Sequence, residues 1–195
     1  MRYAALALAI AITGCATRSY NPPTRYLLEP KVEVLAAQPL RQTLALRSLD
    51  PARPYREKIV YRDGLELGQY QTLEWAELPA NVVSRALGDA LRATGRFADV
   101  GPAPDVSQPD YTLTGSIRAF DLRKDTEPWT AVCEIRVEVR RSLSQNALFA
   151  QTLTSAVPLE SNDTAALPAA MSAAVAEVVT EAANGIAASE ASVAE

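Results

Sequence analysis

The sequence predicts an α/β fold: a single domain in which two main helices pack on one mixed β-sheet. The strand evidence is clearest in Ala131–Arg140, where apolar and charged residues alternate with the period of a half-buried strand. The helix evidence lies in Trp75–Thr94 and Leu167–Ala187, whose apolar residues recur at helical spacing. A chain of 195 residues, 48% of them hydrophobic, is enough for one packed core.

The chain starts with a pattern typical of an export signal, predicted over residues 1–14. Arg2 precedes an uncharged apolar run, Tyr3–Ile12, and Gly14 and Cys15 follow. The run is about ten residues long, too short to cross a hydrocarbon core of roughly 30 Å as a stable helix. The pattern resembles a lipobox, which implies cleavage between Gly14 and Cys15 and acylation of Cys15. An ordinary signal peptide cut later, with Cys15 free or discarded, is the alternative.

Acylation would fix where the mature protein resides. One acyl chain binds membranes only marginally, whereas two or more anchor a protein stably. A covalent lipid on Cys15 is therefore expected to hold the chain in a membrane, with no other cofactor. Ala16 follows the cysteine, and by the sorting rule of such lipoproteins this favours the periplasmic face of the outer membrane. Residues 15–25 are polar and contain Pro22 and Pro23, so we expect them to form a tether.

The predicted domain covers residues 26–187 and opens with short strands. These are Tyr26–Leu28, then Thr43–Leu49 ending at Asp50-Pro51, and a hairpin of Lys58–Arg62 with Leu65–Leu73. The hairpin prediction depends on Asp63-Gly64, a dipeptide suited to a tight turn with positive φ.

The first helix is expected over Trp75–Thr94, with Pro79 in its first turn and Gly95 as its C-terminal cap. A short strand, Phe97–Val100, is expected after it. Pro79 is compatible with the helix because an N–H in the first turn has no intrahelical partner to lose.

The second half of the chain predicts three further strands and a last helix. The strands are Tyr111–Arg118, Ala131–Arg140 and Leu148–Val157, and the last two are expected to form a hairpin. The last helix, Leu167–Ala187, has an apolar stripe of mostly small residues, which lets another surface approach closely. Residues 188–195 are expected to be a frayed tail, and no apolar run after the signal approaches membrane-spanning length.

Composition excludes several classes of function. The formal net charge is −4 and the arginines are dispersed, so the chain has no basic stripe for nucleic acid. Histidine is absent, which removes the commonest general base near neutral pH and the commonest nitrogen ligand of zinc. Serine–lysine and paired-carboxylate chemistry remain open in principle, but the three lysines lie in no recognisable catalytic motif. We therefore expect no enzyme and no metal site.

Several residues have a structural and a functional interpretation. Cys133 lies in the apolar row of its strand, which favours a buried, inert thiol. Trp75 is read as an anchor between helix and sheet, with a ligand platform as the alternative. Asp63 and Glu66 are too few carboxylates for a calcium site. The last helix is expected to pack on the sheet, and an oligomer seam is the alternative.

The polar row of the same strand is formed by Glu134, Arg136, Glu138 and Arg140. The simplest interpretation is a solvated sheet face with cross-strand ion pairs. A partner-binding face is the alternative.

Three segments after Cys15 together resemble one family, the PqiC-like auxiliary lipoproteins of MCE-type ABC transport systems. They are Arg25-Tyr26-Leu27-Leu28-Glu29-Pro30, Lys58-Ile59-Val60-Tyr61-Arg62 and Leu73-Glu74-Trp75-Ala76-Glu77-Leu78. The last differs from the family's "RWAEPL" pattern, with Glu74 in place of Arg and Leu78-Pro79 in place of Pro-Leu. These motifs are structural signatures and contain no catalytic group.

The resemblance implies an outer-membrane lipoprotein that serves lipid transport between the two membranes of a Gram-negative envelope. Its partners would be an MCE-domain protein and, through it, an ABC permease and ATPase. The chain has no P-loop, so ATP hydrolysis would belong to another subunit. A periplasmic lipid-binding shuttle or chaperone and an outer-membrane assembly lipoprotein are the alternatives, and self-association is left open.

Overall fold

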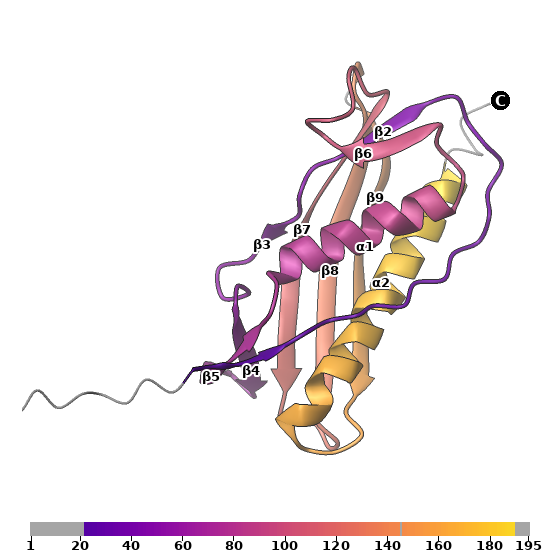
Figure 1. The fold of residues 1–195 in the computed structure, drawn as a ribbon. Coiled ribbons are helices and arrows are strands. Elements are labelled where there is room, and N and C mark those ends of the chain that lie inside the picture. The colour runs from indigo at the N-terminus through magenta and orange to yellow at the C-terminus, as the bar shows by residue number, and fades with distance from the viewer. Residues whose placement is uncertain (1–21, 145, 190–195) are drawn as a thin grey trace, which may run out of the picture.

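The computed structural model describes residues 22–144 and 146–189 as one sheet with both helices on the same face (Figure 1). This confirms the predicted α/β class with a mixed sheet. The strands are β1 (Thr24–Tyr26), β2 (Thr43–Leu46), β3 (Asp50–Pro51), β4 (Lys58–Asp63), β5 (Glu66–Trp75), β6 (Asp99–Pro102), β7 (Tyr111–Arg123), β8 (Thr130–Arg141) and β9 (Ala147–Pro158). The helices are α1 (Pro79–Ala93) and α2 (Leu167–Ser189), the second entered by a 3-10 turn at Thr164–Ala166.

The long strand β7 organises the sheet. One of its edges pairs in parallel with β2, β3 and β4 in turn, from its start to its end. Its other edge pairs antiparallel with β8, which pairs antiparallel with β9. Short strands β6 and β1 complete the sheet beside β2 and β5. The predicted β8–β9 hairpin is confirmed, and the predicted strand Tyr111–Arg118 proves longer, ending at Arg123.

The β4–β5 hairpin forms as predicted around Asp63-Gly64. Gly64 has φ +57°, the left-handed conformation that glycine adopts without a steric penalty. The predicted start of the first helix at Trp75 is wrong, because Trp75 ends β5 and pairs with Tyr26 of β1. Pro79 instead occupies the first position of α1, where its missing N–H costs nothing. Gly95, with φ +65°, ends the helix.

Other strand boundaries also differ from the sequence-based expectation. The strand predicted over Thr43–Leu49 ends at Leu46. The first strand ends at Tyr26, since Leu28 leaves the sheet and packs into the core. The segment Phe97–Val100 contributes a strand only from Asp99 onward, where the pairing with Thr43 of β2 begins. Asp50-Pro51, expected to end a strand, forms the two-residue strand β3 on β7.

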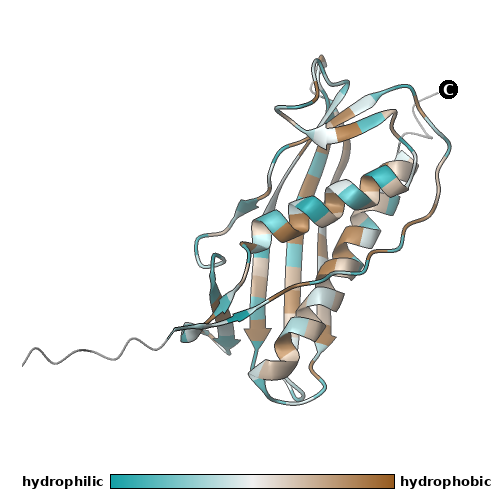
Figure 2. Ribbon diagram, viewed as in Figure 1, coloured by the Kyte–Doolittle hydropathy of each residue, from teal (hydrophilic) through white to brown (hydrophobic). Residues whose placement is uncertain are grey.

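Helix α2 closes the core over β8 and β9. Its buried face includes Met171, Val175, Val178 and Ile186, and it faces the apolar row of β8, where Cys133 is fully buried. By length and composition the helical stretch Thr164–Ser189 is apolar enough to cross a membrane, with a mean hydropathy of 1.3, contrary to our expectation. Its burial against the sheet accounts for that composition, and Figure 2 shows α2 paler and browner than α1.

The opposite face of β8 carries its charged row. Glu138 pairs with Arg136 and Arg140, and these three side chains are partly exposed. The row is therefore in contact with solvent, as predicted. These ion pairs run along β8, and the pairing across strands is a hydrogen bond that Thr154 of β9 donates to Glu134 (3.4 Å).

An extended segment, residues 27–42, crosses the helical layer from the β1 end toward β2 (Figure 1). We call it the strap. The amide N–H of Glu29 donates to Ser172 Oγ (3.1 Å), and that of Leu35 donates to Asn184 Oδ1 (3.0 Å). Farther on, the Ala37 N–H donates to the carbonyl of Thr94 (2.8 Å). The strap is thus fixed to α2 and to the end of α1.

Candidate binding groove

The family-motif residues of β4 have structural roles. Ile59 and Val60 are fully buried in the core. Two arginines approach the fully buried carboxylate of Asp121. Arg62 Nε is 3.8 Å from Oδ2, and Arg123 Nε is 3.7 Å from Oδ1. Tyr55 donates a 2.9 Å hydrogen bond to the same carboxylate. A buried charge must be paired to be tolerated, so Arg62 stabilises the sheet through Asp121.

The motif that precedes α1 is structural as well. Trp75 is 4% exposed and meets Phe120 edge-on, with ring centroids 5.6 Å apart, so it anchors the sheet as interpreted from the sequence. The Ala76 N–H donates to the carbonyl of Tyr26 (2.8 Å). The Glu77 carboxylate accepts a 2.6 Å hydrogen bond from Arg85 of α1.

The side chains of the motif around Tyr26 point in two directions. Tyr26 packs partly against the core and Leu28 is 4% exposed. Leu27 points the other way and is 58% exposed. An exposed leucine at a motif position marks a surface, and Leu27 lines a groove between the strap and α2.

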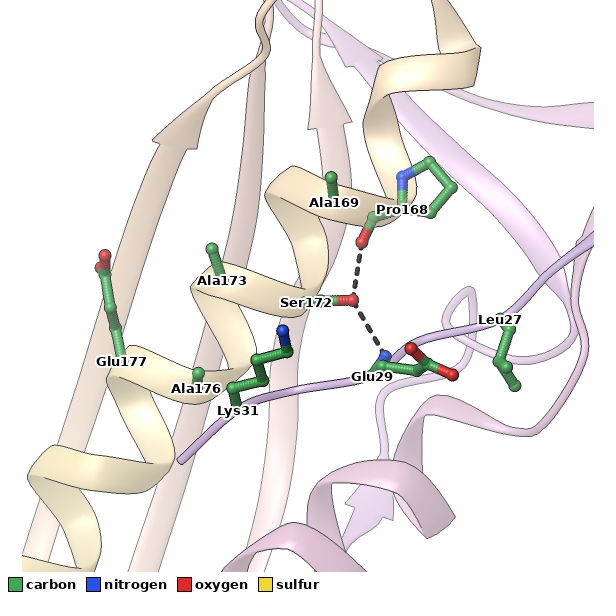
Figure 3. A pocket seen from close by; sticks show the side chains of 9 residues that line it. All are labelled: Leu27, Glu29, Lys31, Pro168, Ala169, Ser172, Ala173, Ala176 and Glu177. Carbon is green, nitrogen blue, oxygen red and sulfur yellow. Dashed lines mark hydrogen bonds between the residues drawn. The ribbon is translucent and has the colours of Figure 1, made fainter. Parts of the chain in front are cut away.

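The groove lies between the strap and the outward face of α2 and has a volume of about 750 Å³ (Figure 3). Its floor is formed by small side chains of the helix. The strap supplies Leu27, Glu29 and Lys31, and α2 supplies Pro168, Ala169, Ser172, Ala173, Ala176 and Glu177. Volumes of this size are typical of ligand or peptide sites.

The polar groups of the groove are mostly used within the protein. Ser172 Oγ donates to the carbonyl of Pro168 (2.7 Å) while it accepts from the Glu29 amide. Glu177 accepts from Ser155 of β9 (2.5 Å). The side chains of Glu29 and Lys31 remain on the rim and face solvent (Figure 3). The groove therefore has a shallow apolar floor beside a rim with both acidic and basic side chains. This arrangement suits binding and contains no activated nucleophile.

Catalytic and metal chemistry find no support in residues 22–144 and 146–189. These ranges contain no cluster of three or more Cys, Asp or Glu placed to hold a metal ion. Burial raises the pKa of the Cys133 thiol far above its usual value, so this cysteine is neither a nucleophile nor a ligand at neutral pH. Asp63 and Glu66 are exposed at the turn of their hairpin.

The predicted lipidation and cleavage residues, Cys15 and Gly14, lie outside the described residues, as do the proposed signal and most of the tether. They stay predictions. The groove itself was missed in the sequence analysis. Its signal was the alternation of Leu28, Pro30, Val32 and Val34 with polar residues, which is the period of an extended segment covered on one side.

Comparison with known proteins identifies the family. The model of the ABC-type transport auxiliary lipoprotein component matches residues 27–183, nearly the whole described domain. The chain therefore belongs to this family of lipid-anchored transport accessory proteins, as the sequence resemblance implied. No protein of curated function matches the chain.

Solved structures agree with the fold. Protein XCC0632 from Xanthomonas campestris is 25% identical, with a TM-score of 0.75, and the match covers 87% of this chain and 99% of that one. The hypothetical protein CT253 from Chlamydia trachomatis is 10% identical, with a TM-score of 0.51, over 75% of this chain and 98% of that one. The second likeness concerns the fold alone.

Proposed function

We propose that the chain is an outer-membrane lipoprotein that faces the periplasm and docks an MCE-type ABC lipid transport system, without catalysis of its own. The observation that carries the proposal is membership of the transport auxiliary lipoprotein family. The lipobox-like sequence at Cys15 supplies the anchor, and Ala16 supplies the preference for the outer membrane. The partner is the MCE-domain protein, which connects to the permease and ATPase.

The groove is the docking surface that we propose for that partner. Its floor of Ala169, Ala173 and Ala176 lets a protein segment approach α2 closely. Its rim carries Glu29, Lys31 and Glu177, which can pair with charged side chains of either sign. A lipid tail would gain little here, because the groove is open and a tail would keep part of its surface in water. This favours a docking module over a lipid shuttle.

Anchoring and docking are tested separately. In the first test, Cys15→Ser is expected to move the protein from the outer-membrane fraction to the soluble periplasm. A Cys15→Ser protein that still fractionates with the outer membrane would refute the anchor.

In the second test, Ala173→Glu places a bulky charge on the groove floor without touching the core. Ala188→Glu, at an exposed position of the same helix beyond the groove, is the matched control. We expect only Ala173→Glu to abolish cross-linking to the MCE-domain protein in intact envelopes. Equal cross-linking by both variants would refute the groove as the docking surface. Phospholipid retained by the native protein in mass spectrometry would instead favour the shuttle.

A further inference from the structure

The turn of the β4–β5 hairpin exposes apolar side chains at one end of the molecule. Leu65 is 103% exposed, so it contacts nothing within the protein, and Leu67 is 49% exposed. Large apolar residues that are fully exposed at the tip of an ordered hairpin gain nothing for folding. Leu143 in the β8–β9 turn is 98% exposed as well, so exposure alone does not identify a membrane contact, and the side chains around Leu65 decide its role.

Behind this tip lies a cluster of amphipathic side chains. The Lys124 ammonium is 4.3 Å from the ring centroid of Tyr61 and 4.8 Å from those of Tyr70 and Trp129. Tyr61 pairs with Gly68, two residue pairs behind the last pair of the hairpin, Asp63 with Glu66. At about 3.4 Å per residue, Tyr61 therefore lies roughly 7 Å behind the turn, and Lys124 and Trp129 adjoin the residues paired beside Arg62.

That order of side chains is the one found at membrane surfaces. Tryptophan and tyrosine are enriched at the depth of the lipid head groups, and lysine extends its ammonium to the same level. Apolar side chains beyond them enter the acyl region. Here the three rings and Lys124 occupy the first level, and Leu65 at the tip occupies the second. Leu67 lies between the two levels, opposite Arg62.

The chain direction places the lipid anchor on the same side. Strand β1 runs parallel to β5 with Thr24 opposite Leu73, so the chain enters β1 from the side of the hairpin turn (Figure 1). Cys15 precedes Thr24 by nine residues, and the turn glycine, Gly64, precedes Leu73, the partner of Thr24, by the same number. Nine residues span at most about 30 Å, whatever their conformation. The tether therefore keeps the start of β1 within about 30 Å of the bilayer, close enough for the hairpin turn to reach it.

We propose that the β4–β5 hairpin is a second membrane contact, with Leu65 at its tip inserted at the level of the outer acyl carbons. The inference rests on the proposed lipid anchor at Cys15. Its partner is a neutral phospholipid surface, because Asp63 and Glu66 flank Leu65 and disfavour an anionic one. Anchor and hairpin together fix the orientation of the domain, and they direct the β8–β9 turn away from the membrane.

The test uses a fluorescent label on the lipidated protein in vesicles. An acylated Cys15 and a buried Cys133 leave an introduced cysteine as the one accessible thiol expected. Leu65→Cys places an environment-sensitive dye at the proposed contact. Leu143→Cys is the matched control, since Leu143 is 98% exposed in the β8–β9 turn at the other end of β8.

In neutral phosphatidylcholine–phosphatidylethanolamine vesicles we expect the dye at position 65 to shift its emission to shorter wavelength. We also expect nitroxide groups on the lipid tails to quench it. The dye at position 143 should emit as it does in water. Equal, water-like emission at both positions in vesicle-bound protein overturns the inference, as does contact that requires phosphatidylglycerol.

Failure of the anchor gives a different result. In that case neither labelled protein floats with the vesicles after centrifugation, which refutes acylation at Cys15. The same samples at high lipid concentration still report on the hairpin. A shifted emission at position 65 alone then supports a membrane contact without the anchor, and no shift overturns both proposals.

Discussion

The hydroxyl of Tyr55 donates a 2.9 Å hydrogen bond to the carboxylate of Asp121, and both side chains are buried on the sheet face away from the helices. Arg62 and Arg123 flank the same carboxylate. A buried aspartate that lost these partners would be an uncompensated charge, which costs several kcal/mol. The arginine of the family's β4 motif is therefore explained by folding, and docking is left to other surfaces.

Tyr55→Phe should change how stability depends on pH. Burial raises the pKa of Tyr55 to about 12, and the charge and hydrogen bond of Asp121 add to the shift. A tyrosine in the unfolded chain ionises near pH 10, so its contribution is present below pH 10 and is lost as the pH rises toward 12. At pH 8 we expect Tyr55→Phe to lower the free energy of unfolding by about 0.5–1.5 kcal/mol.

Urea unfolding of both proteins between pH 8 and pH 11.5 measures this difference. It should shrink as the pH rises, because only the wild type has to keep Tyr55 protonated. Subtracting the two curves removes the contribution of the other six tyrosines, which both proteins share. A difference that stays constant over this range would contradict the raised pKa.

Gly115→Ala and Gly68→Ala should differ in cost although both glycines lie within strands. A Cβ on Gly115 would lie 2.4 Å from the carbonyl oxygen of Arg136, which belongs to the backbone of the paired strand and cannot move alone. A Cβ on Gly68 would meet the end of the Tyr61 ring, which can swing aside. We expect about 1 kcal/mol for Gly68→Ala and about 3 kcal/mol for Gly115→Ala, measured by urea unfolding.

A second substitution can separate the causes of the two losses in stability. Removing the ring in Gly68→Ala/Tyr61→Ala should abolish the part due to the clash, so the two substitutions would not be additive. Trimming Leu49, whose Cδ2 the new Cβ would also meet, should relieve only part of the cost of Gly115→Ala, because the clash with the Arg136 carbonyl remains. Equal costs at the two positions would contradict the close approach of β7 and β8.

Local patterns predicted the long elements well. Ala131–Arg140 alternates strictly, and Leu167–Ala187 keeps an apolar stripe, so both elements follow from the side-chain period. Trp75 shows where this reasoning fails. Its apolar neighbours fit a helical stripe, but pairing of β5 with β1, 49 residues earlier in the chain at Glu74 and Arg25, keeps it in a strand. Such pairing depends on contacts that no local window contains.

The groove was harder to predict from the sequence than the fold. Leu27 belongs to a recognisable motif, but its exposure depends on how the strap crosses α2. The hydrogen bonds that fix the strap join residues 143 and 149 positions apart. Small residues of α2 suggested a close approach without indicating what approaches. In the structure one side of this helix meets the sheet and the other lines the groove.

Asn184→Ala should release the middle of the strap. Asn184 Oδ1 accepts the N–H of Leu35, and a single hydrogen bond contributes about 1 kcal/mol. Alanine is a better helix former than asparagine, which offsets part of that loss in global stability. We therefore expect little change in urea unfolding and faster hydrogen exchange at the Leu35 amide.

Ser172→Ala is the matched control, because it releases the Glu29 amide near the start of the strap. Each variant should accelerate exchange at its own strap position. If both variants accelerated both amides equally, the strap would open as one unit, contrary to the independent attachments seen here.

The thiol of Cys133 should be inert in the folded protein. It lies within the apolar row of β8 and faces α2, and burial raises its pKa far above that of a free cysteine. A thiol reagent added to the native protein at pH 8 should therefore react only as fast as the domain unfolds, while denatured protein reacts at once. The check is the rate of reaction with and without denaturant, with Cys133→Ser as the blank. The reactive thiolate forms only after α2 leaves the sheet, so the labelling rate also measures how often the core opens. Fast labelling of the native protein would show that α2 does not keep its face of β8 covered.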